Sequence, residues 1–427
     1  MVSLIVFALA CLGAADRLLA QERVYDLSNY KARYELRPGM RLYLFSDFDG
    51  DYARAQEASQ SGRLYSSTSW FMNRNTDERI SFWRLNSWMN LSFGSPGSSP
   101  FNPDENRTAF SGSISVDTRR DYYREPEKFW GWSTDSQLKN SRSSQDQSSR
   151  LSRLSFQGRL YRGKGRIEFA EDALLANWML EDLQKAGITS NYIAEDVEAL
   201  ALTITDIIGN RVFDFRRRRI YELEQLQQTL LERGVAREES FQLFAILNDN
   251  WAFANRAALT HGNRFAYGVA TAASGMTIRQ PEDDYTDLGL DLEFGGFAEY
   301  TRSRIINNNG SISLTGGLQL GRYVDLSKVN SEDTENDGQG WSGELYLTYR
   351  RKWLPNSRTE FSWNNTLAVN QILQTNTGLD SSNFLTSERL TSSLFTQYFI
   401  NYQWSFAAAV GFDLQYERAP DQLRFMP

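Results

Sequence analysis

Apolar and polar residues alternate one by one through much of the chain, and this period of two constrains the fold more than any other feature. In residues 288–294, leucines and a phenylalanine occupy the even positions, whereas glycine, aspartate and glutamate occupy the odd ones. Because successive side chains of a β-strand point to opposite faces, the pattern predicts strands with one apolar and one polar face. Strands are expected at residues 39–47, 62–75, 79–94, 106–120, 128–138 and 150–163, and again within residues 263–416.

The connections between these segments are short and long in turn. The short ones hold turn-forming residues, and the Asn309-Gly310 pair favours a type I′ hairpin turn. The long ones are polar, and residues 133–152 include a run rich in Ser, Gln, Asn and Arg, which requires contact with water. We therefore expect tight turns at 75–78, 309–310 and 355–357, and long loops at 94–105, 139–149 and 325–340.

Residues 166–260 interrupt this pattern, because apolar residues there recur three and four positions apart. Leu175, Met179 and Leu183 form one such stripe, with acidic residues between them. Glycines follow three of the periodic segments, at the kind of position where helices end. Four helices are expected, near residues 169–183, 195–208, 217–233 and 238–254.

The first twenty residues are typical of a secretory signal peptide. Residues 2–13 are apolar, which suits the core of such a signal and is short for spanning a bilayer. The usual basic residues before that core are absent, which leaves open a start further upstream. Cys11 is the single cysteine of the chain, and the alternative is a lipoprotein cysteine, although the residues before it match that signal poorly. Cleavage of the signal peptide would remove Cys11, and the exported chain would then have no thiol for a disulfide or a metal site.

The composition excludes two broad classes of protein. The chain has 53 acidic and 46 basic residues, which argues against general nucleic-acid binding, so no nucleic-acid partner is expected. A mean hydropathy of -0.51 excludes a bundle of membrane helices. It does not exclude a membrane β-barrel, because the strands of such a barrel are only half apolar.

Through its alternating strands, its alternating short and long connections and its leader, the chain resembles bacterial outer-membrane β-barrel proteins over residues 39–163 and 263–416. The resemblance implies a mainly β protein of the bacterial outer membrane, an antiparallel transmembrane β-barrel of about 12–14 strands with an inserted periplasmic α-helical bundle. A large soluble β-sandwich is the structural alternative. The implied divisions are a signal peptide (1–20), the first half of the barrel (21–165), the helical insert (166–260) and the second half (261–427).

The strand count does not fit the resemblance completely. Residues 404–416 would be the thirteenth strand, whereas single-chain bacterial barrels normally have an even number. Residues 423–427 also lack the terminal aromatic residue that the resemblance implies. A missing closing strand would explain the odd count, and so would a first segment, residues 39–47, that does not span the membrane.

Two groups of charged and polar residues are candidates for function. The predicted lumen is lined by residues that alternate with the apolar face, namely Asp291, Glu293, Glu344, Arg350, Glu360 and Asn364. The basic run Arg216, Arg217, Arg218 and Arg219 is a candidate for binding an anion, a phospholipid or a protein partner at the periplasmic face. The alternative for this run is a solvated helix face, because Asp214 and Glu222 each stand four positions from Arg218 and favour local ion pairs.

Asp47, Asp49 and Asp51 are similar to the start of a calcium-binding loop. Tyr52 stands where such a loop needs glycine, and Ala58 stands where it needs glutamate. An acidic surface loop is therefore the alternative.

His261, the only histidine, would need a serine nucleophile beside it to support hydrolysis. A polar residue at the junction of helices and strands is the simpler interpretation. We predict no catalytic residue, no metal site and no cofactor.

Three hypotheses for function follow. The first is a porin-like channel, transport or export barrel whose helices plug or gate the lumen or dock a partner. The second is a non-conducting scaffold or assembly component that anchors a periplasmic complex through the helices. The third, a membrane enzyme, depends on His261 alone. The expected partners are outer-membrane lipid and a periplasmic protein.

Overall fold

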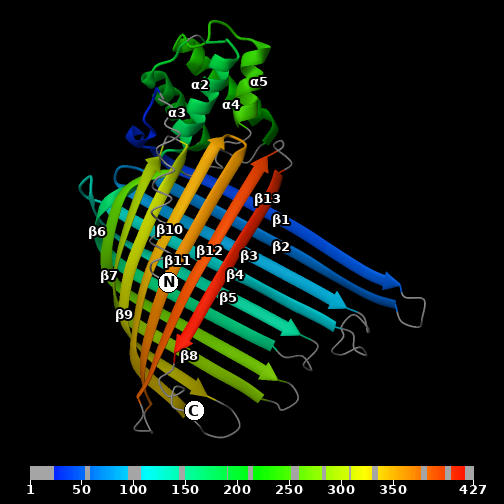
Figure 1. Ribbon diagram of the computed structural model, residues 1–427, viewed down its shortest axis with the longest axis vertical. Coiled ribbons are helices and arrows are strands. Elements are labelled where there is room, and N and C mark those ends of the chain that lie inside the picture. The colour runs from blue at the N-terminus through cyan, green and yellow to red at the C-terminus, as the bar shows by residue number, and fades with distance from the viewer. Residues whose placement is uncertain are drawn as a thin grey trace, which may run out of the picture.

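The residues that the structure describes form thirteen strands in one antiparallel sheet, so the fold is mainly β (Figure 1). The computed structural model describes residues 24–52, 58–94, 107–143, 150–189, 191–209, 215–251, 259–280, 285–306, 309–328, 335–376, 382–399 and 405–418. The signal peptide predicted at residues 1–20 lies outside this described part.

Each strand pairs with the next one along the chain, so the strand order in the sheet is the order in the sequence. The predicted strands are confirmed, including a thirteenth that covers most of residues 404–416. A β-sandwich needs two packed sheets, and the described strands form one. The strands are β1 (Tyr34–Tyr52), β2 (Ala58–Asn75), β3 (Arg79–Gly94), β4 (Arg107–Tyr123), β5 (Lys128–Ser143), β6 (Arg150–Phe169), β7 (Thr260–Gln280), β8 (Tyr285–Ile306), β9 (Gly310–Lys328), β10 (Glu335–Asn356), β11 (Thr359–Asn376), β12 (Ser382–Phe399) and β13 (Ser405–Arg418).

The sheet is not closed. Among the described residues, β1 and β13 each pair with a single neighbour and not with each other. Because successive strands are antiparallel and their number is odd, these two edge strands run in the same direction.

Three tight turns lie at one end of the sheet, between β2 and β3, between β8 and β9, and between β10 and β11. The tight turns predicted at 75–78, 309–310 and 355–357 lie between strands as expected. Strands β9 and β10 extend further than predicted, to Lys328 and from Glu335, into the stretch expected to be a loop. Polar residues continue the ladder there because backbone pairing, unlike the apolar pattern, does not require burial.

One face of the sheet is apolar and exposed. The register places Ile114 beside Leu138 and Leu138 beside Leu154, across β4, β5 and β6. Their exposed fractions are 52%, 49% and 59%, so the row is open to the surroundings. A similar row crosses β10 to β13 at Leu347, Leu367, Leu390 and Leu414.

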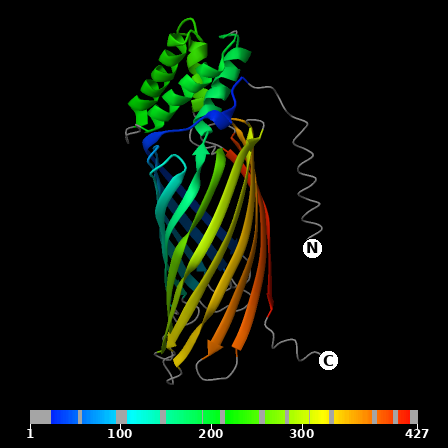
Figure 2. The ribbon, with the colours of Figure 1, turned by 90° about the vertical axis from the view of Figure 1, so that its left-hand side faces the viewer.

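Side chains of strands that are not neighbours meet on the opposite, polar face. The Arg264 Nε atom on β7 lies 3.3 Å from the Asp121 Oδ2 atom on β4. In a flat sheet, strands three places apart would be about 14 Å from each other. The sheet must therefore curl toward its polar face, as Figures 1 and 2 show. We call this concave face, which bears Asp121 and Arg264, the inner face, and the apolar face the outer face.

Four α-helices lie between β6 and β7 in the chain, at the predicted positions. They sit at the end of the sheet that carries the tight turns, here called the helical end (Figure 2). None of the described helices is both long and apolar enough to cross a bilayer. The helices are α2 (Glu171–Lys185), α3 (Ala194–Gly209), α4 (Phe215–Glu232) and α5 (Phe241–Trp251), preceded near the N-terminus by the short 3-10 helix η1 (Leu27–Asn29).

The helices share one buried core, which includes Leu174, Leu200, Leu226 and Leu247. Helix α2 packs against α3 and α5, and α4 packs against the same two helices. The helix end predicted at Gly187 is also found, because α2 ends just before it, at Lys185. The backbone at Gly187 has a φ of 74°, a left-handed geometry that glycine adopts readily. We call residues 171–251 the helical region.

Candidate functional site

A buried carboxylate organises the inner face near the helical end. Asp121 has no exposed surface, and its carboxylate accepts hydrogen bonds from Arg119 at 2.8 Å and from the Tyr161 hydroxyl at 2.7 Å. Arg264, which is 5% exposed, is its second cationic partner. A buried charge is tolerated only when it is paired and hydrogen-bonded, and Asp121 meets both conditions.

The ion pairs continue across further strands. Arg264 also lies 3.5 Å from Glu299 on β8, and the Tyr346 hydroxyl on β10 donates to the same glutamate at 2.6 Å. Arg159 on β6 approaches Glu299 to 3.9 Å. A network of ion pairs and hydrogen bonds therefore crosses the concave face from β4 to β10. We call Arg119, Asp121, Arg159, Tyr161, Arg264, Glu299 and Tyr346 the inner cluster.

A glycine lets this cluster form. Gly131 on β5 stands in register between Asp121 on β4 and Tyr161 on β6. A Cβ atom at Gly131 would lie 2.6 Å from the Tyr161 ring and 2.7 Å from the Asp121 carboxylate. Both approaches are far inside van der Waals contact, so the hydroxyl can cross the intervening strand only because position 131 lacks a side chain.

A cavity of about 390 Å³ adjoins the cluster on its helical side. Asp121, Arg119 and Arg264 lie on its wall, and Ile167 and Phe169, the last residues before α2, lie on it as well. Its size falls in the range of small-molecule pockets, and its lining mixes charges of both signs with aromatic rings. The cavity therefore lies at the level where the chain leaves the sheet for the helices.

Arg37 at the first strand holds the helical region to the sheet through ion pairs with Asp172 and Glu171, and a further pair, Arg33 with Glu168, joins the segment before β1 to the end of β6. Arg37 on β1 pairs with Asp172 of α2 at 2.5 Å, and both side chains are at most 2% exposed. Asp172 also accepts from the Thr205 hydroxyl of α3. Arg33 donates to both carboxylate oxygens of Glu168, at 2.7 and 2.9 Å.

Apolar packing and a more distant ion pair complete the attachment. The helical core continues into the sheet end through Tyr30, Leu259 and Leu354. On the far side, Arg358 in the turn between β10 and β11 donates to both carboxylate oxygens of Asp249 in α5, at 2.9 and 2.7 Å. The helical region is thus fixed at both sides of the sheet end.

Burial raises the pKa values of two groups, Glu171 and Tyr30, beside the contact between the helical region and the sheet. It raises the pKa of the Glu171 carboxyl to about 7, and the neighbouring Asp172 carboxylate adds to the rise. One oxygen of Glu171 is buried without a hydrogen-bond partner in the described part of the chain. Burial also raises the pKa of Tyr30, whose hydroxyl therefore stays protonated and donates to the Ala201 carbonyl oxygen at 3.1 Å.

The six predicted lumen positions share the inner face by register. Glu293 accepts hydrogen bonds from Ser342 at 2.7 Å and from Gln319 at 3.3 Å. Alternation along the strands and pairing across them place the other five on the same face, namely Asp291, Glu344, Arg350, Glu360 and Asn364. Among these, Arg350 donates a hydrogen bond to Asn364, and Glu360 forms an ion pair with Lys352. That they line a lumen stays a prediction.

The basic run at 216–219 lies at the start of α4. Arg218 pairs with Glu222 four positions later, at 3.2 Å, as the local-pairing alternative predicted. Arg219 donates to the side chain and the carbonyl oxygen of Asn248 in α5. The side chains of Arg216 and Arg217 lie outside the described part of the chain, so binding by the run as a whole stays a prediction.

The residues of the predicted calcium loop have an extended backbone, but their side chains lie outside the described part of the chain, so calcium binding there stays a prediction. Asp47, Asp49 and Asp51 lie in β1 and pair in register with Arg63, Ser61 and Ser59 of β2. An extended strand does not wrap its residues around one ion as a calcium loop does. Within the described residues, no cluster of three acidic, histidine or cysteine side chains is arranged to hold a metal.

His261 lies at the start of β7, at the predicted junction. Its Nε2 atom is 3.0 Å from the Tyr30 carbonyl oxygen. This contact ties the first described segment of the chain to the sheet and fits the interpretation of a polar junction residue.

The inner cluster was not predicted from the sequence. Arg119 and Asp121 alternate with the apolar face of β4, and that alternation was the available signal. It identifies the face that each residue occupies but not its partner three strands away. A comparison with models of known protein families gives no match, and no curated protein matches the sequence either.

Replacing the central carboxylate should destabilise the protein. Asp121→Asn removes the ionic partner of Arg119 and leaves the buried Arg264 with Glu299 alone, which we expect to lower the free energy of unfolding by about 3 kcal/mol. Urea titration followed by tryptophan fluorescence would measure the change. Asp291→Asn, at an exposed inner-face position, is the matched control and should change it by less than about 0.5 kcal/mol. Equal losses in the two variants would contradict a structural role for the cluster.

Glu171 should make stability depend on pH. Its pKa is higher in the folded protein than the ordinary value of 4.5, so the folded state loses stability as the pH rises from about 4.5 to about 7. Glu171→Gln removes this titration. The unfolding free energy of E171Q relative to the wild type should therefore increase across that window, by on the order of 2 kcal/mol, and level off above it. The exposed Glu224→Gln should show no such trend, and a flat difference for E171Q would refute the assignment.

Proposed function

We propose that the protein is an outer-membrane β-barrel of the channel type, with an α-helical bundle inserted between β6 and β7 that closes its periplasmic end. The exposed apolar outer face supports membrane insertion most strongly. Rows such as Ile114, Leu138 and Leu154 would be costly in water and are suited to lipid. The described strands have 14 to 22 residues, more than the 9 to 11 or so that a tilted strand needs to cross hydrocarbon.

Aromatic pairs next to the tight turns support the same proposal. On the outer face, Tyr122 stacks on Trp130 with ring centroids 4.6 Å apart, on either side of the turn between β4 and β5. Trp353 and Phe361 stack at 5.0 Å on either side of the turn between β10 and β11. Aromatic rings gather at the level of the lipid headgroups in membrane barrels, so these pairs would mark the periplasmic interface.

Closure of the sheet is part of the proposal. Unpaired backbone groups at the edges of β1 and β13 cannot face hydrocarbon. In the membrane these edges would pair, either directly or through one further strand. Direct pairing would be parallel, whereas a further strand would give fourteen strands and the usual even number.

The inner face suggests a water-filled passage. It carries acidic, basic and amide side chains along its length, as the lumen of a channel does. The inner cluster narrows this space at the helical end, and the helical region is fixed across the same end by Arg37 and Arg358. A closed resting state follows, with the helical region as the plug.

A scaffold is the second candidate, and a feature of the helical region favours it. Several of its large apolar side chains are more than half exposed, and Phe241 at the start of α5 is 86% exposed. Ile220 and Tyr221 of α4 are exposed by 56% and 58%. Surfaces of this kind mark contacts with other proteins, so the helical region would recruit a periplasmic partner.

Conductance of single molecules in planar bilayers tests the first candidate against the second. The wild type should conduct little, and a variant that replaces residues 171–251 by a short Gly-Ser linker should show a stable, larger conductance. Glu224→Gln, an exposed change within the helical region, should behave as the wild type does. A deletion variant that floats with vesicles and still conducts no more than the wild type would reject the channel in favour of the scaffold.

A further inference from the structure

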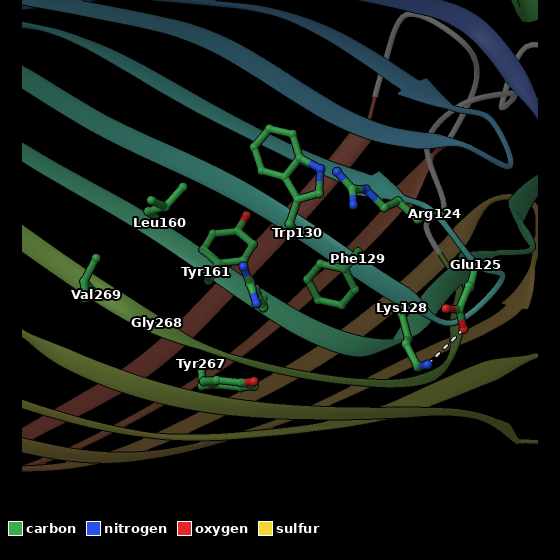
Figure 3. Close-up of a pocket in the computed structure, with 11 residues that line it drawn as sticks. Arg124, Glu125, Lys128, Phe129, Trp130, Leu160, Tyr161, Tyr267, Gly268 and Val269 are labelled. Atoms are coloured by element: carbon green, nitrogen blue, oxygen red, sulfur yellow. Dashed lines mark ion pairs between the residues drawn. The ribbon is translucent and has the colours of Figure 1, made fainter.

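A hollow of about 750 Å³ lies near the helical end, and most of the side chains that line it belong to the outer face, although Tyr161 of the inner cluster is also among its lining residues (Figure 3). Its walls come from the turn between β4 and β5 and from β5, β6 and β7. Trp130, Leu160, Tyr267 and Val269 line it and are exposed by 39%, 56%, 53% and 45%. No described segment of the protein covers these side chains, although they are large and apolar.

The register arranges the polarity of this hollow in layers. Leu160 pairs with Val269 in the row nearest the middle of the sheet. In the next outer-face row toward the helical end, Arg162 stands between Trp130 and Tyr267. The following row holds Lys128 beside Lys164. Successive rows on one face are about 7 Å apart, so the surface changes from apolar to aromatic to basic over about 14 Å.

Two of the basic groups are free to bind an external anion. Lys128 is paired with Glu125 at 3.0 Å, drawn as the dashed line in Figure 3, and Lys164 is paired with Glu127 at 3.4 Å. The guanidinium groups of Arg124 and Arg162 have no acidic partner among the described residues, and both side chains are exposed. An arginine can hold a phosphate through two parallel hydrogen bonds.

We propose that this hollow is a binding site for one anionic glycerophospholipid. Arg124 and Arg162 would hold the phosphate, Trp130 and Tyr267 would pack against the glycerol region, and an acyl chain would lie along Leu160 and Val269. The layering matches the order of these parts in a lipid that stands upright in the membrane. The inference rests on the proposed function, which places this end of the outer face in the periplasmic leaflet.

Native mass spectrometry of the full chain, released from detergent micelles that contain either phosphatidylglycerol or phosphatidylcholine, tests the site. The wild type should retain one phosphatidylglycerol under activation that removes phosphatidylcholine. Arg124→Gln with Arg162→Gln should weaken retention about tenfold or more, because two charge-assisted contacts are lost. Lys185→Gln with Arg237→Gln removes the same charge from exposed positions on the helical region and should leave retention unchanged.

Three further measurements distinguish a failure of the lipid site from a failure of the proposed function. Leu160→Ser with Val269→Ser should also weaken retention, because the acyl chain would lose its apolar contact while both arginines remain. Added inorganic phosphate should not displace the lipid; displacement would show a simple phosphate site and overturn the proposal.

Flotation with vesicles checks membrane insertion separately. A chain that does not float contradicts the proposed function, whereas floating variants that retain lipid as the wild type does overturn the lipid site alone.

Discussion

The ladder of backbone hydrogen bonds between consecutive strands determines the rest of this structure. Because side chains alternate along each strand, the pairing register decides for every residue which face it occupies, and a shift by one residue would exchange the two faces. The observed register aligns Ile114, Leu138 and Leu154 on the outer face. The same register aligns Asp121, Gly131 and Tyr161 on the inner face. The apolar exterior and the buried ion pairs are therefore two results of one set of hydrogen bonds.

Charge and apolar packing act together where the helices meet the sheet. Arg37 and Asp172 would each be costly to bury alone, and their pairing is tolerated because Thr205 and the surrounding helical core complete the site. The inner cluster follows the same rule a short distance into the sheet, around Asp121. Both networks lie at the helical end, so buried ion pairs of the sheet and of the helical attachment occur close together in the fold.

Features that depend on nearby residues could be predicted from the sequence, and those that depend on distant ones could not. Periods of two and of three to four residues located the strands and the four helices. Arg37 and Asp172 are 135 residues apart, and Arg264 meets Asp121 only because the sheet curls, so neither pair leaves a local signal. At Asp47 the local resemblance to a calcium loop did not predict the extended backbone, which is determined by pairing with β2. Whether β1 and β13 pair with each other also depends on the arrangement of the whole sheet, so the open edges could not be predicted from nearby residues either.

The helical region is attached to β1 through Arg37 and to the turn between β10 and β11 through Arg358. These two anchors are ten strands apart in the sheet, yet one compact unit joins them. The helical region consequently limits how far β1 can move away from β10 and β11 at the helical end of the sheet. The curvature of the sheet at that end is then set by helix packing as well as by strand pairing, and the opposite end of the sheet has no comparable tie among the described residues.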